Sequence, residues 1–218
     1  DGYTHPSVRM RVDQMPGYLN SVRALAAQYK DKIHILTGFE CEYFPDYMNW
    51  LADMRAENHL DYLILGNHFD HDDEYGMYFG NIRTAAQLRR YVDSAVKGME
   101  TGMFVYLAHP DLFMRSYPEF DHHCKLVSRH ICRTAARLNL PLEYNLGYEE
   151  YNDIRGITTI PYPDFWKVAA HEGCTAIIGV DAHNNQYLEN PFYYSRATET
   201  LRKLGIKVID RIPFLNEK

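Results

Sequence analysis

The chain has 218 residues, of which 46% are hydrophobic and 14% aromatic, so it can build one large core but not two ordinary domains with linkers. Its formal net charge is −6, and the Lys and Arg residues are spread along the sequence rather than clustered. This balance argues against nucleic acid and an anionic membrane surface as partners.

Four cysteines, at positions 41, 124, 132 and 174, form no CxxC pair and predict neither a disulfide framework nor a zinc ribbon. Their spacing favours a reduced compartment, so we expect a cytoplasmic protein. No apolar run reaches the roughly 18 residues that a membrane helix needs, so no membrane contact is expected. The sequence leaves the oligomeric state open.

Short apolar runs, predicted to be buried strands, alternate along the chain with longer amphipathic runs, predicted to be helices. The apolar runs are rich in Ile, Leu, Val and Tyr, and each ends at a Gly, a Pro or a polar cluster. The first half gives helix 13–30, strand 32–40, helix 46–58, strand 61–69, helix 83–100 and strand 103–112. The second half gives helix 121–138, strand 140–147, helix 163–172, strand 174–183, helix 191–204 and strand 205–214.

Regular alternation of strand and helix predicts an α/β fold with a parallel sheet, either an open doubly wound sheet or a barrel. Neither GxGxxG nor GxxxxGK[ST] occurs, so dinucleotide binding and P-loop chemistry have no support. No internal repeat or low-complexity tract marks a boundary, and we expect residues 1–218 to form a single domain.

Ionisable side chains stand at the ends of most of these strands. Glu40, His68 and His109 end the first three predicted strands, and Asp181 and His183 end the fifth. Because the C-terminal ends of parallel strands share one face, where ligands bind, we expect these side chains to form one rim. Nitrogen and oxygen donors without sulfur suit Zn, Mn or Fe(II).

Each of these residues also has a structural interpretation. A single His at a strand end is more often a satisfied polar residue than a metal ligand. Glu40 could be the partner of a helix cap, and Asp181 could N-cap the segment that follows it. This interpretation has to hold separately at every strand, whereas one metal centre explains all of them. The pattern therefore favours a metal centre.

Four motifs, "GFECEYFPDY" (38–47), "DYLILGNHF" (61–69), "LAHPDL" (107–112) and "GVDAH" (179–183), resemble the polymerase and histidinol phosphatase (PHP) superfamily, in particular its histidinol-phosphate phosphatase branch. The resemblance runs over most of the chain. It implies a distorted (β/α)7 barrel of the PHP type with two or three divalent metal ions (Zn, Mn or Fe) at its C-terminal rim. It also implies that a small phosphorylated metabolite, L-histidinol phosphate, is hydrolysed to histidinol and phosphate by a metal-bound hydroxide, a step of histidine biosynthesis.

The resemblance also assigns roles to the rim residues. Glu40 would bridge two metal ions, and His68 and His109 would hold the second of them. Asp181 would bind the first ion, and His183 would bind a third ion or the reacting phosphate. Asp181 and His183 are therefore the expected catalytic residues, and either could protonate the departing alkoxide.

Two arginines match basic positions of the family. Arg155, in "NDIRGITTIPYP", lies where the family places a phosphate-binding arginine, and Arg9, in "VRMR", matches another basic position near the site. Both are predicted to bind substrate. A guanidinium can fork two hydrogen bonds onto phosphate oxygens, which a lysine does less well.

The sequence departs from the family in one respect, because it contains no HxH motif, which the family carries at the end of its first strand. The adjacent His122 and His123 have the wrong place and spacing. The sequence begins roughly where the family approaches its third strand. We therefore expect the first two strands of the barrel to be missing and the domain to be N-terminally incomplete.

Three other interpretations stay open. The protein could be a PHP-type phosphodiesterase acting on another small phosphoester, or a degenerate, non-catalytic module that binds a phosphorylated metabolite. It could also be a metal-free barrel of the triosephosphate isomerase type that binds phosphate at helix ends. The last of these would leave the series of strand-end ionisable residues unexplained.

Overall fold

The computed structural model describes residues 9–72, 74–183 and 185–212, and its strands are short and parallel. β1 (Gly38–Cys41) pairs with β2 (Tyr62–Leu65). β4 (Thr175–Gly179) lies between β3 (Leu142–Asn145) and β5 (Lys207–Val208). The prediction of an α/β fold with parallel strands is confirmed.

Residues 105–108 join these two groups of strands. Leu107 forms a parallel bridge with Leu65 on one side and with Leu142 on the other. The Ala108 N–H donates to Leu65 O at 2.9 Å, and the Glu143 N–H donates to Leu107 O at 2.9 Å. The strands thus form one continuous parallel ladder in the order β1, β2, 105–108, β3, β4, β5.

All six predicted strands are shorter than expected, and in three of them the reason is visible. The segment 103–112 pairs only around Leu107, because His109 adopts a φ of 27° and turns the chain into a 3-10 helix over Leu112–Arg115. The segment 32–40 becomes a strand only at Gly38, since the residues before it include Ile33, whose side chain is exposed and has no core to pack against. The segment 205–214 pairs only at Lys207–Val208, and its last two residues lie outside the described part of the chain.

The long helices agree closely with the predicted ranges. Two short helices, α5 (Glu149–Arg155) and α7 (Gln186–Glu189), are additional, and with 7 and 4 residues they are too short to produce a clear helical periodicity in the sequence. Thr84 and Asp121 accept backbone N–H groups at the starts of α3 (Ala85–Glu100) and α4 (His122–Leu138), which fixes where those helices begin. The α-helices are α1 (Met15–Gln28), α2 (Met48–Glu57), α3 (Ala85–Glu100), α4 (His122–Leu138), α5 (Glu149–Arg155), α6 (Pro163–His171), α7 (Gln186–Glu189) and α8 (Phe192–Lys203). Short 3-10 helices cover Val12–Gln14, Pro45–Tyr47, Phe79–Asn81 and Leu112–Arg115.

The two faces of the ladder differ in chemistry. Leu65, Leu107 and Leu142, which bridge one another across the strands, are fully buried in the core, and Leu65 packs close to Gly98 of α3. The opposite face carries Glu40 on β1 and Glu143 on β3, because successive side chains of a strand point to opposite sides. The hydrophobic face therefore holds the fold together, and the other face is available for polar chemistry.

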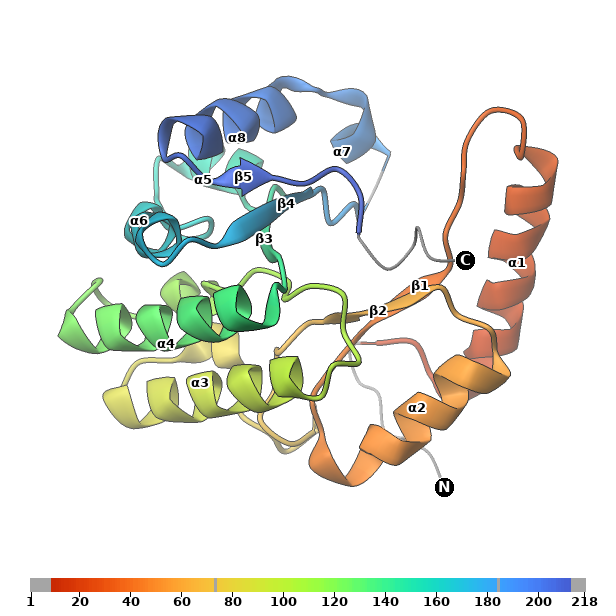
Figure 1. Ribbon diagram of the computed structural model, residues 1–218, viewed down its shortest axis with the longest axis horizontal. Helices are drawn as coiled ribbons and strands as arrows, with labels where there is room; N and C mark the ends of the chain where they lie inside the picture. Colours follow the sequence, from red (N-terminus) through yellow and green to blue (C-terminus); the bar gives the residue numbers. More distant parts are fainter. Residues whose placement is uncertain (1–8, 73, 184, 213–218) are drawn as a thin grey trace.

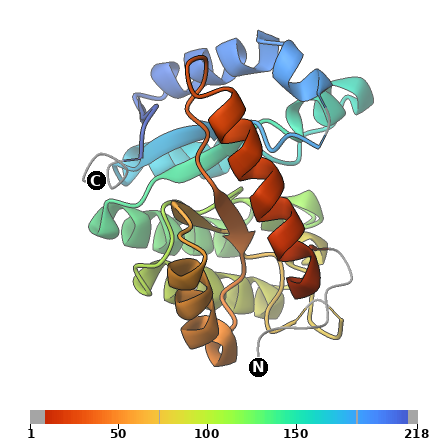
Figure 2. The same ribbon diagram turned by 90° about the vertical axis from the view of Figure 1, so that its right-hand side faces the viewer.

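Helices surround the strands in Figure 1, with α3 and α4 side by side and α6 and α8 near β4 and β5. Figure 2 shows α1 crossing beside β1, where the Tyr18 hydroxyl donates to Gly38 O at 3.2 Å. No helix in the described ranges is long and apolar enough to cross a membrane.

Candidate metal centre

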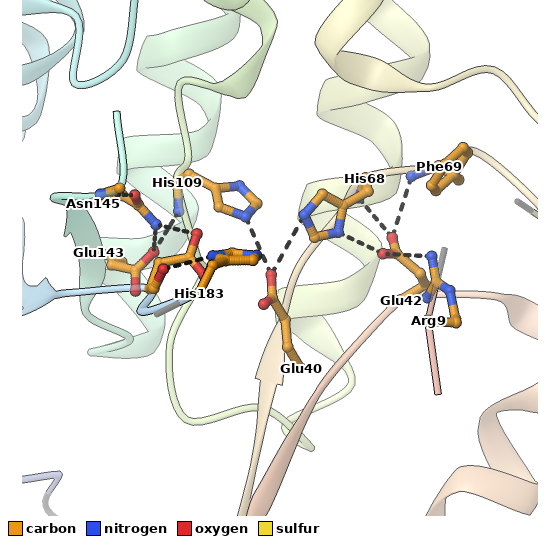
Figure 3. Close-up of polar contacts among 11 residues, drawn as sticks. Arg9, Glu40, Glu42, His68, Phe69, His109, Glu143, Asn145 and His183 are labelled. Carbon is orange, nitrogen blue, oxygen red and sulfur yellow. Dashed lines mark hydrogen bonds and ion pairs between the residues drawn. The ribbon is translucent and has the colours of Figure 1, made fainter. Parts of the chain in front are cut away.

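Glu40, His68 and His109 form a compact group of possible metal ligands. Each offers one donor atom, and the three atoms lie within 4.8 Å of one another. Glu40 Oε1 is 3.5 Å from His68 Nε2 and 3.2 Å from His109 Nε2. Figure 3 shows the Glu40 carboxylate between the two imidazoles. Three residues that lie far apart in the sequence thus converge on one point, as the strand-end pattern predicted.

The local backbone explains how the two histidines reach this point. Gly66 follows β2, and a Cβ at this position would lie 2.7 Å from His68 Nδ1 and 2.8 Å from Glu40 Oε1. Only a residue without a side chain leaves room for this close approach. Asn67, with a φ of 50°, and His109, with a φ of 27°, turn the chain sharply after β2 and after residues 105–108. Such strained residues concentrate at functional sites.

The charges of this group are strongly coupled. Burial alone would raise the pKa of Glu40, but the hydrogen bond and charge of His109, helped by His68 and Arg9, lower it to about 2. Burial would lower the pKa of His109, but the hydrogen bond and charge of Glu40 raise it to about 9. The Glu40 carboxylate therefore attracts positive charge at this point. The proton on His109 supplies that charge, and a metal ion could supply it instead.

The donor set fits a divalent metal ion. His68 Nδ1 lies 2.7 Å from Glu42 Oε1, so this nitrogen donates its proton and His68 Nε2 is left facing the Glu40 oxygen at 3.5 Å. Two facing acceptors need a proton or a cation between them. Imidazole nitrogen and carboxylate oxygen are the ligands that Zn, Mn and Fe(II) take in proteins.

Asp181 and His183 border the same cavity. A pocket of about 320 Å³ is lined by His68, Tyr78, His109, Leu112, Gly147, Tyr148, Asp181 and His183. Asp181 follows β4 with a φ of 48°, and its carboxylate accepts from Asn145 Nδ2 at 3.2 Å. The exposed His183 ring lies with Nδ1 2.8 Å from Asp181 O. The structure thus brings all five predicted rim residues together, with Asp181 and His183 beside the compact group rather than within it.

The two predicted arginines lie in different surroundings. Arg9 contacts Glu42 rather than the pocket itself, with its guanidinium 3.4 Å from the Glu42 carboxylate and over the Phe69 ring. Arg155 lies exposed in the last turn of α5, with its guanidinium 4.5 Å from the centroid of the Tyr151 ring. It is not among the described residues that line the pocket, and its binding of phosphate stays a prediction.

Two buried carboxylates behind the histidines were missed by the sequence reasoning. Glu42 accepts from His68 and Phe69, and Glu143 accepts from the His109 N–H at 3.1 Å and from Asn145 Nδ2 at 2.9 Å. In Figure 3 they lie on opposite sides of the Glu40 group. Glu42 could have been found, because alternation along an extended segment places residues 40 and 42 on the same side.

No protein-family model matches the chain. A curated protein of Deinococcus radiodurans described as "Probable histidinol-phosphatase" is 23% identical over 209 residues, which cover 92% of this chain and 76% of the relative. The predicted resemblance to histidinol phosphatases is thereby confirmed.

A solved structure has a similar fold. It is the histidinol phosphate phosphatase of Lactococcus lactis, complexed with zinc, L-histidinol and phosphate. The two folds match with a TM-score of 0.67 and 18% sequence identity, over 89% of this chain and 76% of the other. This match confirms the α/β architecture of the chain.

Proposed function

We propose that this protein is a metal-dependent phosphomonoesterase that hydrolyses L-histidinol phosphate to histidinol and phosphate. The observation that carries the proposal is the convergence of Glu40, His68 and His109, of which the two histidines line a pocket together with Asp181 and His183. The similarity to a curated probable histidinol-phosphatase supports the choice of substrate.

The proposal extends to the architecture. A continuous parallel ladder with buried Leu65, Leu107 and Leu142 on one face and polar residues on the other is the construction of a barrel wall. We therefore propose that the six described parallel segments belong to a distorted (β/α)7 barrel in a single domain, with the site at the C-terminal ends of its strands. Enzymes of this general design place their chemistry at that end.

Glu40, His68 and His109 would hold one divalent ion, and Asp181 would contribute to a second, in a centre of two or three ions. Such ions neutralise the charge of a phosphoryl group and lower the pKa of water. This contribution is needed because phosphate monoesters have among the highest uncatalysed barriers known. The described residues supply nitrogen and oxygen donors of the kind that Zn, Mn and Fe(II) prefer.

His183 is the proposed proton donor to the leaving oxygen. Its Nδ1 lies 2.8 Å from Asp181 O, so Nδ1–H donates to this carbonyl and Nε2 is free to exchange a proton with a substrate atom. Its side chain is 78% exposed, so it can follow a substrate that enters the pocket. Proton transfer by a positioned side chain contributes about 10²–10⁴-fold to a rate.

The remaining walls of the pocket suit the organic part of a small phosphoester. Tyr78, Leu112 and Tyr148 line it beside the polar residues, and the Tyr78 ring stacks on His68 with 6.4 Å between ring centroids. Arg155 is proposed to bind the phosphate when substrate enters. Aromatic and apolar walls with a few placed polar groups are typical of small-molecule sites.

The test is phosphate release from L-histidinol phosphate by the protein purified with Mn²⁺ or Zn²⁺. We expect Glu40→Gln to slow release by about 10²-fold or more, the scale seen when a group that stabilises transition-state charge is removed. Arg155→Ala should mainly raise KM. Two exposed residues of α8 provide matched controls, Glu199→Gln and Arg202→Ala, which should leave release unchanged.

Unchanged release in both Glu40→Gln and Arg155→Ala would show that the site is wrongly assigned. Release from a phosphodiester, with none from L-histidinol phosphate, would identify a phosphodiesterase. A protein that contains no metal by elemental analysis and releases no phosphate would be a non-catalytic binding module.

A further inference from the structure

The Glu42 carboxylate lies directly behind the proposed metal ligand His68. Its side chain is only 2% exposed, and both of its oxygens are occupied. Oε1 accepts from His68 Nδ1 at 2.7 Å and from the Arg9 guanidinium at 3.4 Å. Oε2 accepts from the backbone N–H groups of His68 at 2.6 Å and of Phe69 at 3.2 Å. Figure 3 shows these contacts on the side of His68 away from Glu40.

We propose that Glu42 is a positioning residue that holds His68 in the tautomer needed to bind a metal ion. An ionised carboxylate can only accept hydrogen bonds, so the ring nitrogen facing it must carry the proton. Nδ1 is therefore protonated, and the lone pair of Nε2 points toward Glu40 Oε1, 3.5 Å away. Carboxylates behind metal-binding histidines fix the tautomer and the ring orientation in this manner.

The other histidine of the group shows that this support is specific to the His68 ring. His109 Nδ1 is buried and has no hydrogen-bond partner among the described residues. Its neighbouring carboxylate, Glu143, accepts from the backbone N–H of His109 and not from its ring. The nitrogen of His109 that faces away from Glu40 thus has no carboxylate behind it, whereas the corresponding nitrogen of His68 is hydrogen-bonded to Glu42.

This inference also gives Arg9 a different role from the one predicted. Burying a carboxylate is unfavourable unless it is paired and hydrogen-bonded. The Arg9 guanidinium provides the opposite charge 3.4 Å away, and the backbone N–H groups of His68 and Phe69 provide the hydrogen bonds. Arg9 then acts through Glu42 on His68, and not by touching the phosphate.

The inference rests on the metal centre of the proposed function but not on its substrate, so its test uses Zn²⁺ alone. A glutamine at position 42 keeps the shape of the side chain but has only one accepting oxygen. Its amide N–H₂ would face either the backbone N–H groups or His68 Nδ1 and Arg9, all of which are donors. We expect Glu42→Gln to raise the Kd for Zn²⁺ about 10–100-fold, the scale typical of such supporting residues.

A matched control is Glu149→Gln. Glu149 is also buried and paired with an arginine, Arg196, but it touches none of the proposed ligands. This variant should lower the thermal stability while leaving the Kd for Zn²⁺ unchanged. A Zn²⁺ affinity of Glu42→Gln equal to that of the wild type would overturn the proposal, as would an equal loss in both variants.

A second measurement on the wild-type protein needs no variant, in case Glu42→Gln does not fold. A long-range ¹H–¹⁵N correlation spectrum should show the Zn²⁺-loaded His68 ring with a proton on Nδ1 and none on Nε2. The reverse tautomer would refute the inference. Zn²⁺ binding with this tautomer but without phosphate release would contradict the proposed function and leave the role of Glu42 intact.

Discussion

Replacing Gly179 with alanine should destabilise the protein, because the new methyl group would collide with the buried carboxylate of Glu143. Gly179 ends β4 opposite Asn145, and a Cβ there would lie 1.8 Å from Glu143 Oε1 and 2.5 Å from its Cδ. Ordinary van der Waals contact begins at about 3.4 Å. Glu143 is only 5% exposed and accepts from the His109 N–H and from Asn145, so it cannot move aside without breaking these contacts.

The expected magnitude follows from these contacts. Forcing an extra methyl group into a packed interior costs about 1–3 kcal/mol. A donor left without its acceptor, such as the His109 N–H, costs a further 1–3 kcal/mol or so. Alanine is favoured over glycine in a strand by about 0.5–1 kcal/mol, which offsets part of this. The free energy of unfolding should fall by about 3 kcal/mol, which lowers the Tm by about 6–12 °C.

Thermal and urea unfolding measure this loss. Gly17→Ala is a control, because a Cβ there meets nothing within 4 Å and the residue is in helix α1, where alanine is favoured. The decisive variant is Gly179→Ala combined with Glu143→Ala, in which the obstructing side chain is gone. If the two single losses simply add in the double variant, the collision with Glu143 is not the cause and the reasoning is refuted.

Two further predictions follow from the described contacts. Gly66→Ala should weaken Zn²⁺ binding, because the new Cβ would collide with His68 and Glu40, and the m-value of urea unfolding should change little. A Zn²⁺ titration measures the affinity, and an unchanged affinity would contradict the close approach at Gly66. At the start of α4, burial opposes ionisation of Asp121, but hydrogen bonds led by the Cys124 N–H lower its pKa from 3.8 to about 2. The free energy of unfolding of the wild type should therefore exceed that of Asp121→Asn by a constant amount above pH 3.8, and the difference should disappear as the pH falls through 2. Urea unfolding of both proteins across this range measures the difference. A difference that does not change with pH would show that the cap is not ionised.

The helices were predictable from sequence because local signals set them. Helix α3 was predicted over 83–100 and extends over Ala85–Glu100, with Thr84 and Gln87 forming the capping pair that starts it. Helix α4 begins after Asp121, whose carboxylate accepts the Cys124 N–H. Amphipathic spacing and a capping side chain are both encoded within a few residues, so no knowledge of the tertiary structure was needed.

Strand lengths were less predictable because pairing depends on distant partners. The predicted strand 103–112 is apolar over its first six residues, yet it pairs only around Leu107. What ends the pairing is the φ of 27° at His109, and nothing in the local composition demands that conformation. A partner strand and a functional turn decide the boundary, and neither is visible in the run itself.

The proposed ligands were predictable for a different reason, which is topology. Parallel strands place their C-terminal ends on one edge, so strand-end residues as distant as Glu40 and Asp181 could be assigned to one site. The residues that support them could not be assigned so easily. Glu143 lies within a strand, where its neighbours in sequence give no sign that it touches the His109 N–H. That contact is set by the register between strands.

The supporting carboxylates and the strained backbone belong to one arrangement. Asn67, His109 and Asp181 all have positive φ angles, a conformation that costs a non-glycine residue about 1–3 kcal/mol. Each strained turn is tied down by a buried polar group. Glu42 accepts the N–H of His68, the residue after Asn67; Glu143 accepts the N–H of His109; and Asn145 donates to Asp181.

The same hydrogen bonds therefore hold the bends and aim the side chains. Burying Glu42 and Glu143 is unfavourable in itself, and it is offset because each carboxylate accepts backbone N–H groups that a tight turn would otherwise leave without partners. The proposed ligands are thus oriented by the folded chain before any ion binds. A metal ion entering this site has to displace protons, but it does not have to reorganise the backbone that presents its ligands.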